Sequence, residues 1–212
     1  MHSPAPPPSP TPDARRDGAA TRQRLIRAAL ELFSTIGFRE TTTPTIAERA
    51  GVAEGTIYRH FKGKEQLLNE VYRGAQRWAL SVVRDVEAEK SLRAPERLQR
   101  IARALIEMAE RDPALLRMLL QPRGDRHLDA QSREAAVQFR EALQQVVAMG
   151  KSDGQVRPGP AELWASVWLA LVGFVVDRVG EKEWTPDHPQ VTQTLEAAWD
   201  AISARPIPPS SL

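Results

Sequence analysis

The sequence predicts an all-α protein of about nine helices, in which a small three-helix N-terminal domain is joined by a long fourth helix to a larger helical domain. Three observations support this. Apolar residues recur at three- and four-residue spacing along most of the chain, as in amphipathic helices. Capping and helix-breaking residues stand where these segments begin and end. Residues 43–61 form two short helical segments around an Ala-Gly-Val turn.

Size and charge favour two domains of different character. The chain has 212 residues, 42% of them hydrophobic, which is enough for a small domain fused to a larger one. The formal charge is only +2, yet residues 21–77 hold ten basic and six acidic residues. A polyanionic partner is therefore expected only at the N-terminal domain.

The ends of the chain and its composition indicate a cytoplasmic protein. Six prolines in the first twelve residues, with no apolar core, exclude a secretory signal and predict a disordered tail over residues 1–19. A second disordered tail is expected over residues 205–212. The absence of cysteine excludes disulfides and thiolate zinc sites. The longest apolar run, residues 163–176, is 14 residues long, whereas a bilayer needs about 20, so no membrane span is expected.

The first helix is expected to begin at Thr21 and to stop at Gly37. Its apolar face consists of Leu25, Ala28, Ala29, Leu32, Phe33 and Ile36. Arg22, Arg24 and Arg27 lie on other faces, where they either meet solvent or approach phosphates.

The second and third helices make a helix-turn-helix. Thr43 is the expected cap of the second helix, with Pro44 in its first turn and Gly51 in the turn that follows. Ile57 and Phe61 anchor the third helix. Its open side carries the side chains that we expect to enter the major groove, together with a glycine: Gly55, Thr56, Tyr58, Arg59 and His60.

The fourth helix begins at Lys64 and continues to about residue 89, far beyond what a DNA-binding domain needs. The boundaries that we predict are 20–65 for the helix-turn-helix domain and 66–204 for the second domain. In the second domain, further helices are expected at residues 95–111, 113–121, 127–150, 160–181 and 188–203, with Asp112 as a cap and Gly150 as a stop.

The helix at 160–181 is apolar around most of its circumference and must be covered on nearly every side. A four-helix interface with a second copy would cover it, although a monomeric core helix is the alternative. The predicted interface residues are Trp164, Leu171, Val175, Leu195 and Trp199.

Large apolar side chains of the second domain line a predicted effector pocket or belong to a plain core. They are Trp78, Met108, Leu115, Met118, Leu119, Phe139 and Trp168.

Nothing in the chain indicates an enzyme. The four histidines are scattered, and no zinc-protease, nucleotide-binding or serine-hydrolase motif occurs. We therefore predict no catalytic residue, no metal site and no cofactor.

From about Thr21 to Tyr72 the chain resembles the DNA-binding domain of the TetR family of bacterial repressors. The resemblance rests on the glycine that ends the first helix, the run IAERAGV, the run GTIYRHF and the following KGKEQL, all in order. It implies a homodimer that binds an operator and responds to a small effector. It also implies base or backbone contacts from Thr56, Arg59 and His60, and phosphate contacts from Tyr58 and Lys64.

Two positions depart from the family pattern. Ala53 replaces a serine that caps the third helix in many members, which removes roughly 1 kcal/mol of capping. Pro44 replaces a long contacting side chain, so contacts from the second helix fall to Thr43 or Thr45. A further hypothesis is that Arg15, Arg16 and Arg22 form an arm that follows the DNA.

The function that we expect is a ligand-responsive regulator, a repressor that binds a palindromic DNA operator as a homodimer. Its effector would be apolar or aromatic. The alternative is a helical ligand-binding or scaffold protein whose helix-turn-helix does not engage DNA.

Overall fold

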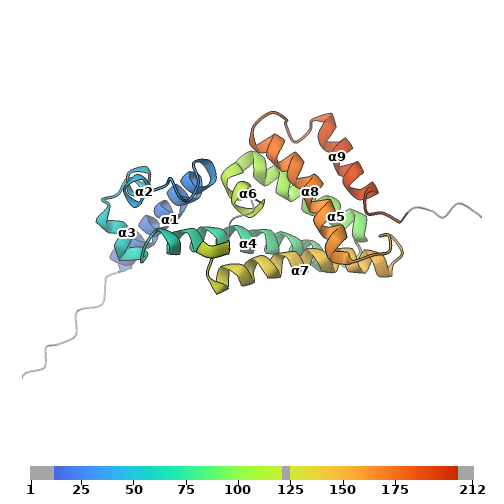
Figure 1. Ribbon diagram of the computed structural model, residues 1–212, viewed down its shortest axis with the longest axis horizontal. Coiled ribbons are helices and arrows are strands. Elements are labelled where there is room, and N and C mark those ends of the chain that lie inside the picture. The colour runs from blue at the N-terminus through green and yellow to red at the C-terminus, as the bar shows by residue number, and fades with distance from the viewer. Residues whose placement is uncertain (1–11, 121–124, 205–212) are drawn as a thin grey trace, which may run out of the picture. The chain divides into compact units, whose positions relative to one another are not determined.

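A computed structural model of the chain describes residues 12–120 and 125–204, which form nine α-helices and one 3₁₀ helix (Figure 1). In this part of the chain the β pairing is one isolated bridge between Val156 and Ser203. The predicted all-α class is therefore confirmed. The predicted tails at residues 1–11 and 205–212 lie outside the described residues.

The chain divides into two compact units, the first ending at Val71 and the second beginning at Tyr72. This boundary lies inside helix α4 (Lys64–Ala88), not at its start, where we had predicted the boundary. One continuous helix of 25 residues therefore belongs to both units.

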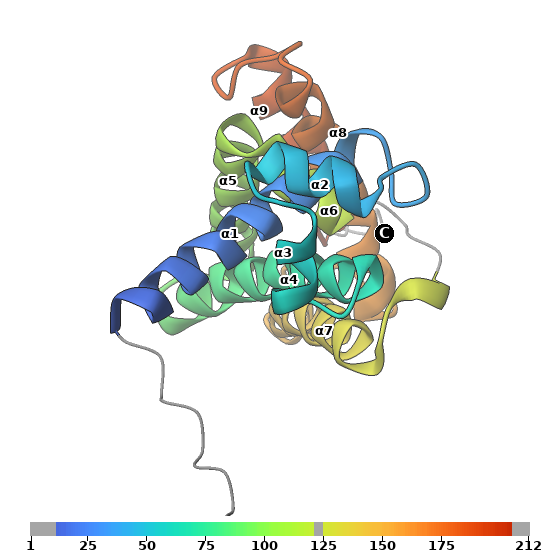
Figure 2. The ribbon, with the colours of Figure 1, turned by 90° about the vertical axis from the view of Figure 1, so that its left-hand side faces the viewer.

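The first unit contains α1 (Pro12–Thr35), α2 (Thr43–Ala50), α3 (Gly55–His60) and the first turns of α4. Figure 2 faces this unit and shows the tight turn between α2 and α3. All four helices contribute apolar side chains to one core, since each of the following is at most 6% exposed: Leu25, Ala29, Phe33, Ile46, Ala47, Ala50, Ile57, Phe61, Leu67 and Leu68.

Helix α1 is longer at its start than we predicted. It begins at Pro12, so residues 12–19 are helical and not part of a disordered tail. Proline is tolerated in a first turn, and the alanines and arginines that follow are good helix formers. At the other end Gly37 takes a φ of 91° and stops the helix as expected, but Ile36 is 49% exposed and does not join the core.

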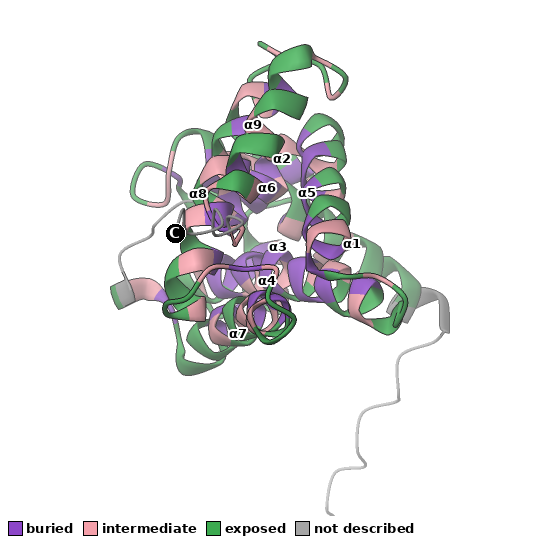
Figure 3. Cartoon of the chain, turned by 90° about the vertical axis from the view of Figure 1, so that its right-hand side faces the viewer, coloured by how far each residue is buried: buried purple, intermediate pink, exposed green. Residues whose placement is uncertain are grey.

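The second unit contains the rest of α4, α5 (Ala94–Arg111), α6 (Pro113–Leu120), the 3₁₀ helix η1 (Asp125–His127), α7 (Ala130–Ser152), α8 (Ala161–Gly180) and α9 (Pro189–Asp200). Helix α8 packs against α5, α6, α7 and α9. Buried residues lie on the faces where these helices meet (Figure 3), and in α8 they are Ala165, Trp168, Val172, Val175, Val176 and Val179.

Helix α8 is the one described helix that is long and apolar enough to cross a membrane, with 20 residues. Six of these residues are buried against the neighbouring helices of the same unit. The other residues of α8 are half-buried or exposed, and length and composition alone do not distinguish a core helix from a membrane span.

Aspartates cap two helices of the second unit. Asp112 accepts a hydrogen bond from the Leu115 amide at 3.2 Å, as predicted for α6. Asp129 caps α7 by accepting from the Ser132 amide at 2.8 Å, and it forms an ion pair with Arg73 of α4 at 2.8 Å. Burial alone would raise the pKa of Asp129, but the hydrogen bonds from Ser132 and Arg73 and the charge of Arg73 hold it below its usual value.

Candidate nucleic-acid interface and ligand pocket

The turn between α2 and α3 depends on Gly51. This residue has φ 65° and ψ 43°, a left-handed conformation in which a side chain is strained. Its amide donates to the Glu48 carbonyl at 3.0 Å, and the Val52 amide donates to the Ala47 carbonyl at 3.0 Å. These bonds satisfy the end of α2 and turn the chain at once into α3.

Helix α3 buries its apolar anchor and exposes its polar side. Ile57 is 0% exposed, and Phe61, directly after the helix, is 2% exposed. Tyr58 and Arg59 are exposed and His60 is half-buried. The described residues provide Arg59 with no hydrogen-bond or ion-pair partner, so its guanidinium is available to an external acceptor.

Two of the predicted DNA-binding residues meet across the helix-turn-helix. The Tyr58 hydroxyl lies 3.3 Å from the Thr43 hydroxyl, although the two residues come from different helices. The pair places two hydroxyl groups side by side at the surface, where both are able to donate to one phosphate.

The cap of α2 is Thr42, and our prediction of Thr43 was wrong by one residue. The Thr42 hydroxyl accepts from the Thr45 amide at 3.3 Å and lies 2.8 Å from the Thr45 hydroxyl. Thr43 is therefore the first helical residue, which leaves its side chain available to Tyr58. The N-cap of α3 is Glu54, one residue after Ala53, which we had predicted at this position, and its side chain makes no capping hydrogen bond.

Lys64 is engaged inside the first unit. Its ammonium donates to the carbonyls of Phe38 and Thr41 at 2.7 Å each and to that of Arg39 at 3.4 Å. It also lies 4.3 Å from the centre of the Phe38 ring. The predicted phosphate contact from Lys64 stays a prediction; in this structure the donors of its ammonium are directed at carbonyls of its own chain.

The arginines of α1 are mostly bound within the chain. Arg22 pairs with Glu70 at 2.7 Å and lies over the Phe61 ring, and Arg27 pairs with Glu31 at 2.8 Å. These contacts favour a structural role over phosphate binding. Arg39 and Lys62 are exposed basic residues in the loops of this unit that our sequence reasoning did not single out, although the local excess of charge indicates them.

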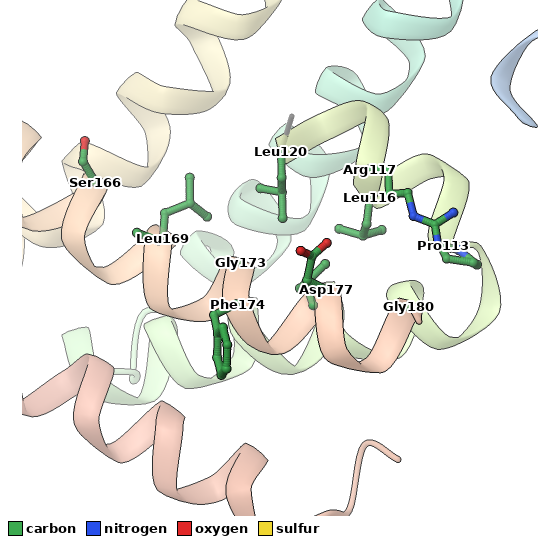
Figure 4. Close-up of a pocket in the computed structure, with 12 residues that line it drawn as sticks. Pro113, Leu116, Arg117, Leu120, Ser166, Leu169, Gly173, Phe174, Asp177 and Gly180 are labelled. Atoms are coloured by element: carbon green, nitrogen blue, oxygen red, sulfur yellow. The ribbon is translucent and has the colours of Figure 1, made fainter. Parts of the chain in front are cut away.

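The second unit contains a pocket of about 750 Å³ between α6 and α8. In Figure 4, Leu116 and Leu120 of α6 and Asp177 of α8 point into the space between the two helices. The lining is mostly apolar: Pro113, Leu116, Leu120, Leu169, Ala170, Gly173, Phe174, Val176 and Gly180, with Arg117, Ser166 and Asp177 as its polar members. Arg117 pairs with Glu181 at 2.8 Å.

The predicted effector residues do not line this pocket. Met118, Leu119, Phe139 and Trp168 are core residues of at most 7% exposure, while Trp78, Met108 and Leu115 are half-buried. Trp168 lines a smaller pocket of about 350 Å³ beside α5 and α9. Helical spacing alone did not distinguish core residues from pocket residues, because the same residue types serve both.

The predicted dimer residues differ in how much surface they could offer to a second copy. Val175 is 0% exposed within the single chain and has no surface to offer. Trp164 donates to the Pro158 carbonyl at 3.2 Å and stacks under Arg157, so it fixes its own loop. Leu171, Leu195 and Trp199 are half-buried, and the exposed large apolar residues of α8 are Leu163 and Phe174, at 48% and 49%.

The described residues contain no group of three or more histidine, aspartate or glutamate side chains arranged to hold a metal ion.

Comparison with known proteins identifies the fold. In solved structures, a TetR family transcription regulator from Marinobacter aquaeolei VT8 covers 90% of this chain and all of its own, with a TM-score of 0.72 at 22% identity. The ketosteroid transcriptional regulator KstR2 of Mycobacterium tuberculosis covers 87% of this chain and 95% of its own, with a TM-score of 0.65 at 25% identity.

Comparison of sequences identifies the family. The sequence model of the bacterial regulatory proteins of the tetR family matches residues 25–71, which include α2, α3 and the turn between them. The HTH-type transcriptional repressor KstR2 of Mycobacterium tuberculosis is 31% identical over 142 residues, which cover 65% of this chain and 70% of that protein. The chain therefore belongs to the TetR family and is a ligand-responsive, DNA-binding transcriptional regulator.

Proposed function

We propose that this protein is a cytoplasmic repressor that binds a palindromic DNA operator as a homodimer, through two copies of α3, and that a small apolar molecule releases it. The observation that carries the DNA-binding site is the surface of the helix-turn-helix. The Thr43–Tyr58 hydroxyl pair lies next to Arg59, which has no partner among the described residues.

The division of roles on this surface follows from chemistry. The two hydroxyl groups suit phosphate oxygens, which fix the position of the protein on the duplex without reading its sequence. Arg59 suits guanine, because a guanidinium donates to O6 and N7 at once. Thr56 and His60 lie on the same short helix and would contact neighbouring bases or the backbone.

A two-fold dimer would cover the exposed face of α8. Leu163 and Phe174 expose about half of their side chains there, and such large apolar residues favour association with a second copy. Half-buried Leu195 and Trp199 of the neighbouring α9 would extend the interface.

The pocket between α6 and α8 is the effector site that we propose. Its volume of about 750 Å³ accommodates a drug-sized molecule, and its lining is mostly aliphatic and aromatic. Asp177 and Arg117 would fix the polar end of a ligand. The relative named as a ketosteroid transcriptional regulator supports an apolar effector of this kind.

Release from DNA requires that the effector bind one dimer geometry better than another. Phe174 lines the pocket and also belongs to the exposed face of α8. A ligand beside Phe174 would therefore change the surface through which two copies pair, and with it the separation of the two α3 helices.

Selection of bound sequences from random duplex DNA tests the DNA-binding proposal. The expected result is a palindromic motif whose half-sites lie one helical turn, about 34–36 Å, or a multiple of it apart. Recovery of no enriched motif at low salt would contradict it.

The effector proposal is tested with Gly173→Leu. A Cβ on Gly173 would meet only Leu120 Cδ1, at 3.8 Å, so a leucine there extends into the pocket without a backbone clash. Apolar ligands that raise the Tm of the wild-type protein should lose that effect in Gly173→Leu, while DNA binding persists. An unchanged thermal shift in Gly173→Leu would exclude this pocket.

A further inference from the structure

The three polar side chains of the pocket between α6 and α8 differ in what they bind within the chain. Arg117 pairs with Glu181 at 2.8 Å, and the Ser166 hydroxyl donates to the Glu162 carbonyl at 2.8 Å. The Asp177 carboxylate makes no hydrogen bond or ion pair with another described residue. It is therefore the polar group of this pocket whose capacity to accept hydrogen bonds is available to a ligand.

The positive charges beside Asp177 are paired with other carboxylates. Arg117, in the pocket, faces Glu181, and Arg178, the residue after Asp177, pairs with Glu183 at 2.7 Å. Asp177 also lies in the last turn of α8, where the helix macrodipole adds partial negative charge. This end of the pocket thus has a negative charge that no described residue balances.

Asp177 lies near one end of an elongated apolar lining. In Figure 4 its carboxylate points from α8 into the space beside Leu116 and Leu120 of α6. The α8 residues of the lining extend from Ser166 to Gly180, a rise of about 21 Å along the helix axis. The lining that α8 contributes between Ser166 and Asp177 is apolar: Leu169, Ala170, Gly173, Phe174 and Val176. A ligand that fills the pocket would place an apolar body along α8 and a polar end at Asp177.

We propose that the effector is an elongated apolar molecule with one protonated amine, which pairs with Asp177. The proposal rests on the proposed function and names the chemical class of its effector. An apolar body in the pocket removes part of the water around the carboxylate, and an ammonium group replaces that water with charge-assisted hydrogen bonds. A carboxylate ligand would meet the like charge of Asp177 and would have to displace Glu181 to reach Arg117.

Three molecules of one skeleton test this class: phenylhexylamine, phenylhexanol and phenylhexanoate, each with the phenyl ring at the end of the chain. At neutral pH they are cationic, uncharged and anionic. Isothermal titration calorimetry measures their dissociation constants for the wild-type protein, Asp177→Asn and Asp85→Asn. Asp85→Asn is the control, because it removes an exposed carboxylate that does not line the pocket.

The wild-type protein and Asp85→Asn should bind the amine about fivefold more tightly than the alcohol, and the carboxylate most weakly. The factor is that of an ion pair which solvent reaches, because Asp177 is exposed. In Asp177→Asn the amine and the alcohol should have similar dissociation constants. Equal binding of amine and alcohol by the wild type, an amine preference that persists in Asp177→Asn, or tightest binding of the carboxylate would each overturn the amine class.

Gly173→Leu separates the amine class from the pocket itself, because a leucine there should abolish binding of all three molecules. If the wild type binds all three equally and Gly173→Leu binds none, the pocket stands and the amine class fails. If Gly173→Leu binds them as tightly as the wild type, or the wild type binds none of them, the proposed effector pocket fails and the amine class with it.

Discussion

The basic residues of the first unit differ in whether their side chains have a hydrogen-bond or ion-pair partner within the chain. Arg22, Arg27 and Lys64 each have an acceptor within 3 Å, and Arg49 pairs with Glu31 at 3.0 Å. Arg59 has no such partner among the described residues. A long side chain that keeps its hydrogen-bonding capacity at an exposed site is the one best placed to read a base.

Replacing Arg59 by alanine should therefore relax sequence preference more than it weakens binding overall. A bidentate contact to guanine discriminates against other bases by about 1–3 kcal/mol. Selection from random duplex DNA with Arg59→Ala should return a motif that loses its preference at one position of each half-site.

The control for this experiment is Arg49→Ala, since Arg49 is exposed on α2 but paired with Glu31. Its motif should match that of the wild-type protein. An unchanged motif from Arg59→Ala would mean that Arg59 does not read a base and that another residue of α3 does.

Helix α7 shows how tertiary neighbours decide what a residue does in an element. We had predicted that Gly150 ends this helix, but the helix continues to Ser152. A Cβ built on Gly150 would lie 2.6 Å from the Ala94 Cβ and 2.9 Å from Val156 Cγ2. The glycine is there because α5 and the 153–160 loop approach too closely for any side chain.

Gly150→Ala should consequently lower the free energy of unfolding by about 1–3 kcal/mol, as overpacking does. The matched control is Gly74→Ala on α4, where a Cβ would meet nothing within 4 Å. There the gain in helix propensity should raise stability by roughly 0.5–1 kcal/mol. Thermal or denaturant unfolding measures the change in the free energy of unfolding for both variants. If both variants were stabilised, or both destabilised, this explanation would be contradicted.

The cap of α7 gives a pH-dependent prediction. The pKa of Asp129 is lowered in the folded protein, so its stabilisation is fully present above the pKa of an unfolded aspartate and is lost as the pH falls through the folded value. Asp129→Asn keeps a side chain that can cap α7 but removes the charge that pairs with Arg73, so it should reduce stability by roughly 0.2–1 kcal/mol at pH 7, and the difference should shrink below about pH 4.

Exposed Asp85 of α4 provides the control, because Asp85→Asn removes the same charge at a position that caps no helix and has no ion pair among those of the described residues. Unfolding of the two variants at several pH values separates a local interaction from a change in net charge. A deficit in Asp129→Asn that persists at low pH would mean that the carboxylate charge is not its cause.

Elements whose ends carry strong local signals were predictable from the sequence. Asp112, Gly37 and Gly51 perform the capping and turning roles that their residue types favour. Where several candidates stand together, the local signal is degenerate: three threonines precede Pro44, and only the structure selects Thr42 as the cap.

The candidate site was predictable in its outline but not in its internal contacts. The period of α3 separates its buried anchor from its exposed polar residues, and that is a local property. Two contacts depend on residues that only folding brings together. Lys64 donates to the Thr41 carbonyl of the α1–α2 loop, and Trp164 donates to the Pro158 carbonyl. The pocket between α6 and α8 likewise depends on how two helices pack.

For the whole molecule, the decisive property is the pairing of two copies. A single α3 offers one short reading helix, and a dimer supplies the second at a fixed distance. In the proposed dimer, the exposed apolar residues of α8 form the surface through which the two copies pair.

Leu163→Glu should therefore weaken the dimer about tenfold or more, because it places a charge where about half of an apolar side chain is available for burial. Sedimentation over a range of concentrations measures this change. Glu162→Gln alters the adjacent charge and should leave the dimer intact. If the Leu163→Glu protein remains as dimeric as the wild type, the exposed face of α8 is not the dimer interface.

Hydroxyl-radical footprinting of the wild-type protein on its selected duplex, at increasing salt, tests the central claim most directly. We predict two protected patches related by two-fold symmetry and separated by one helical turn, about 34–36 Å, or a multiple of it, which fade together as salt rises. A single patch, protection that does not respond to salt, or no protection at any salt would contradict binding by a dimer through its two α3 helices.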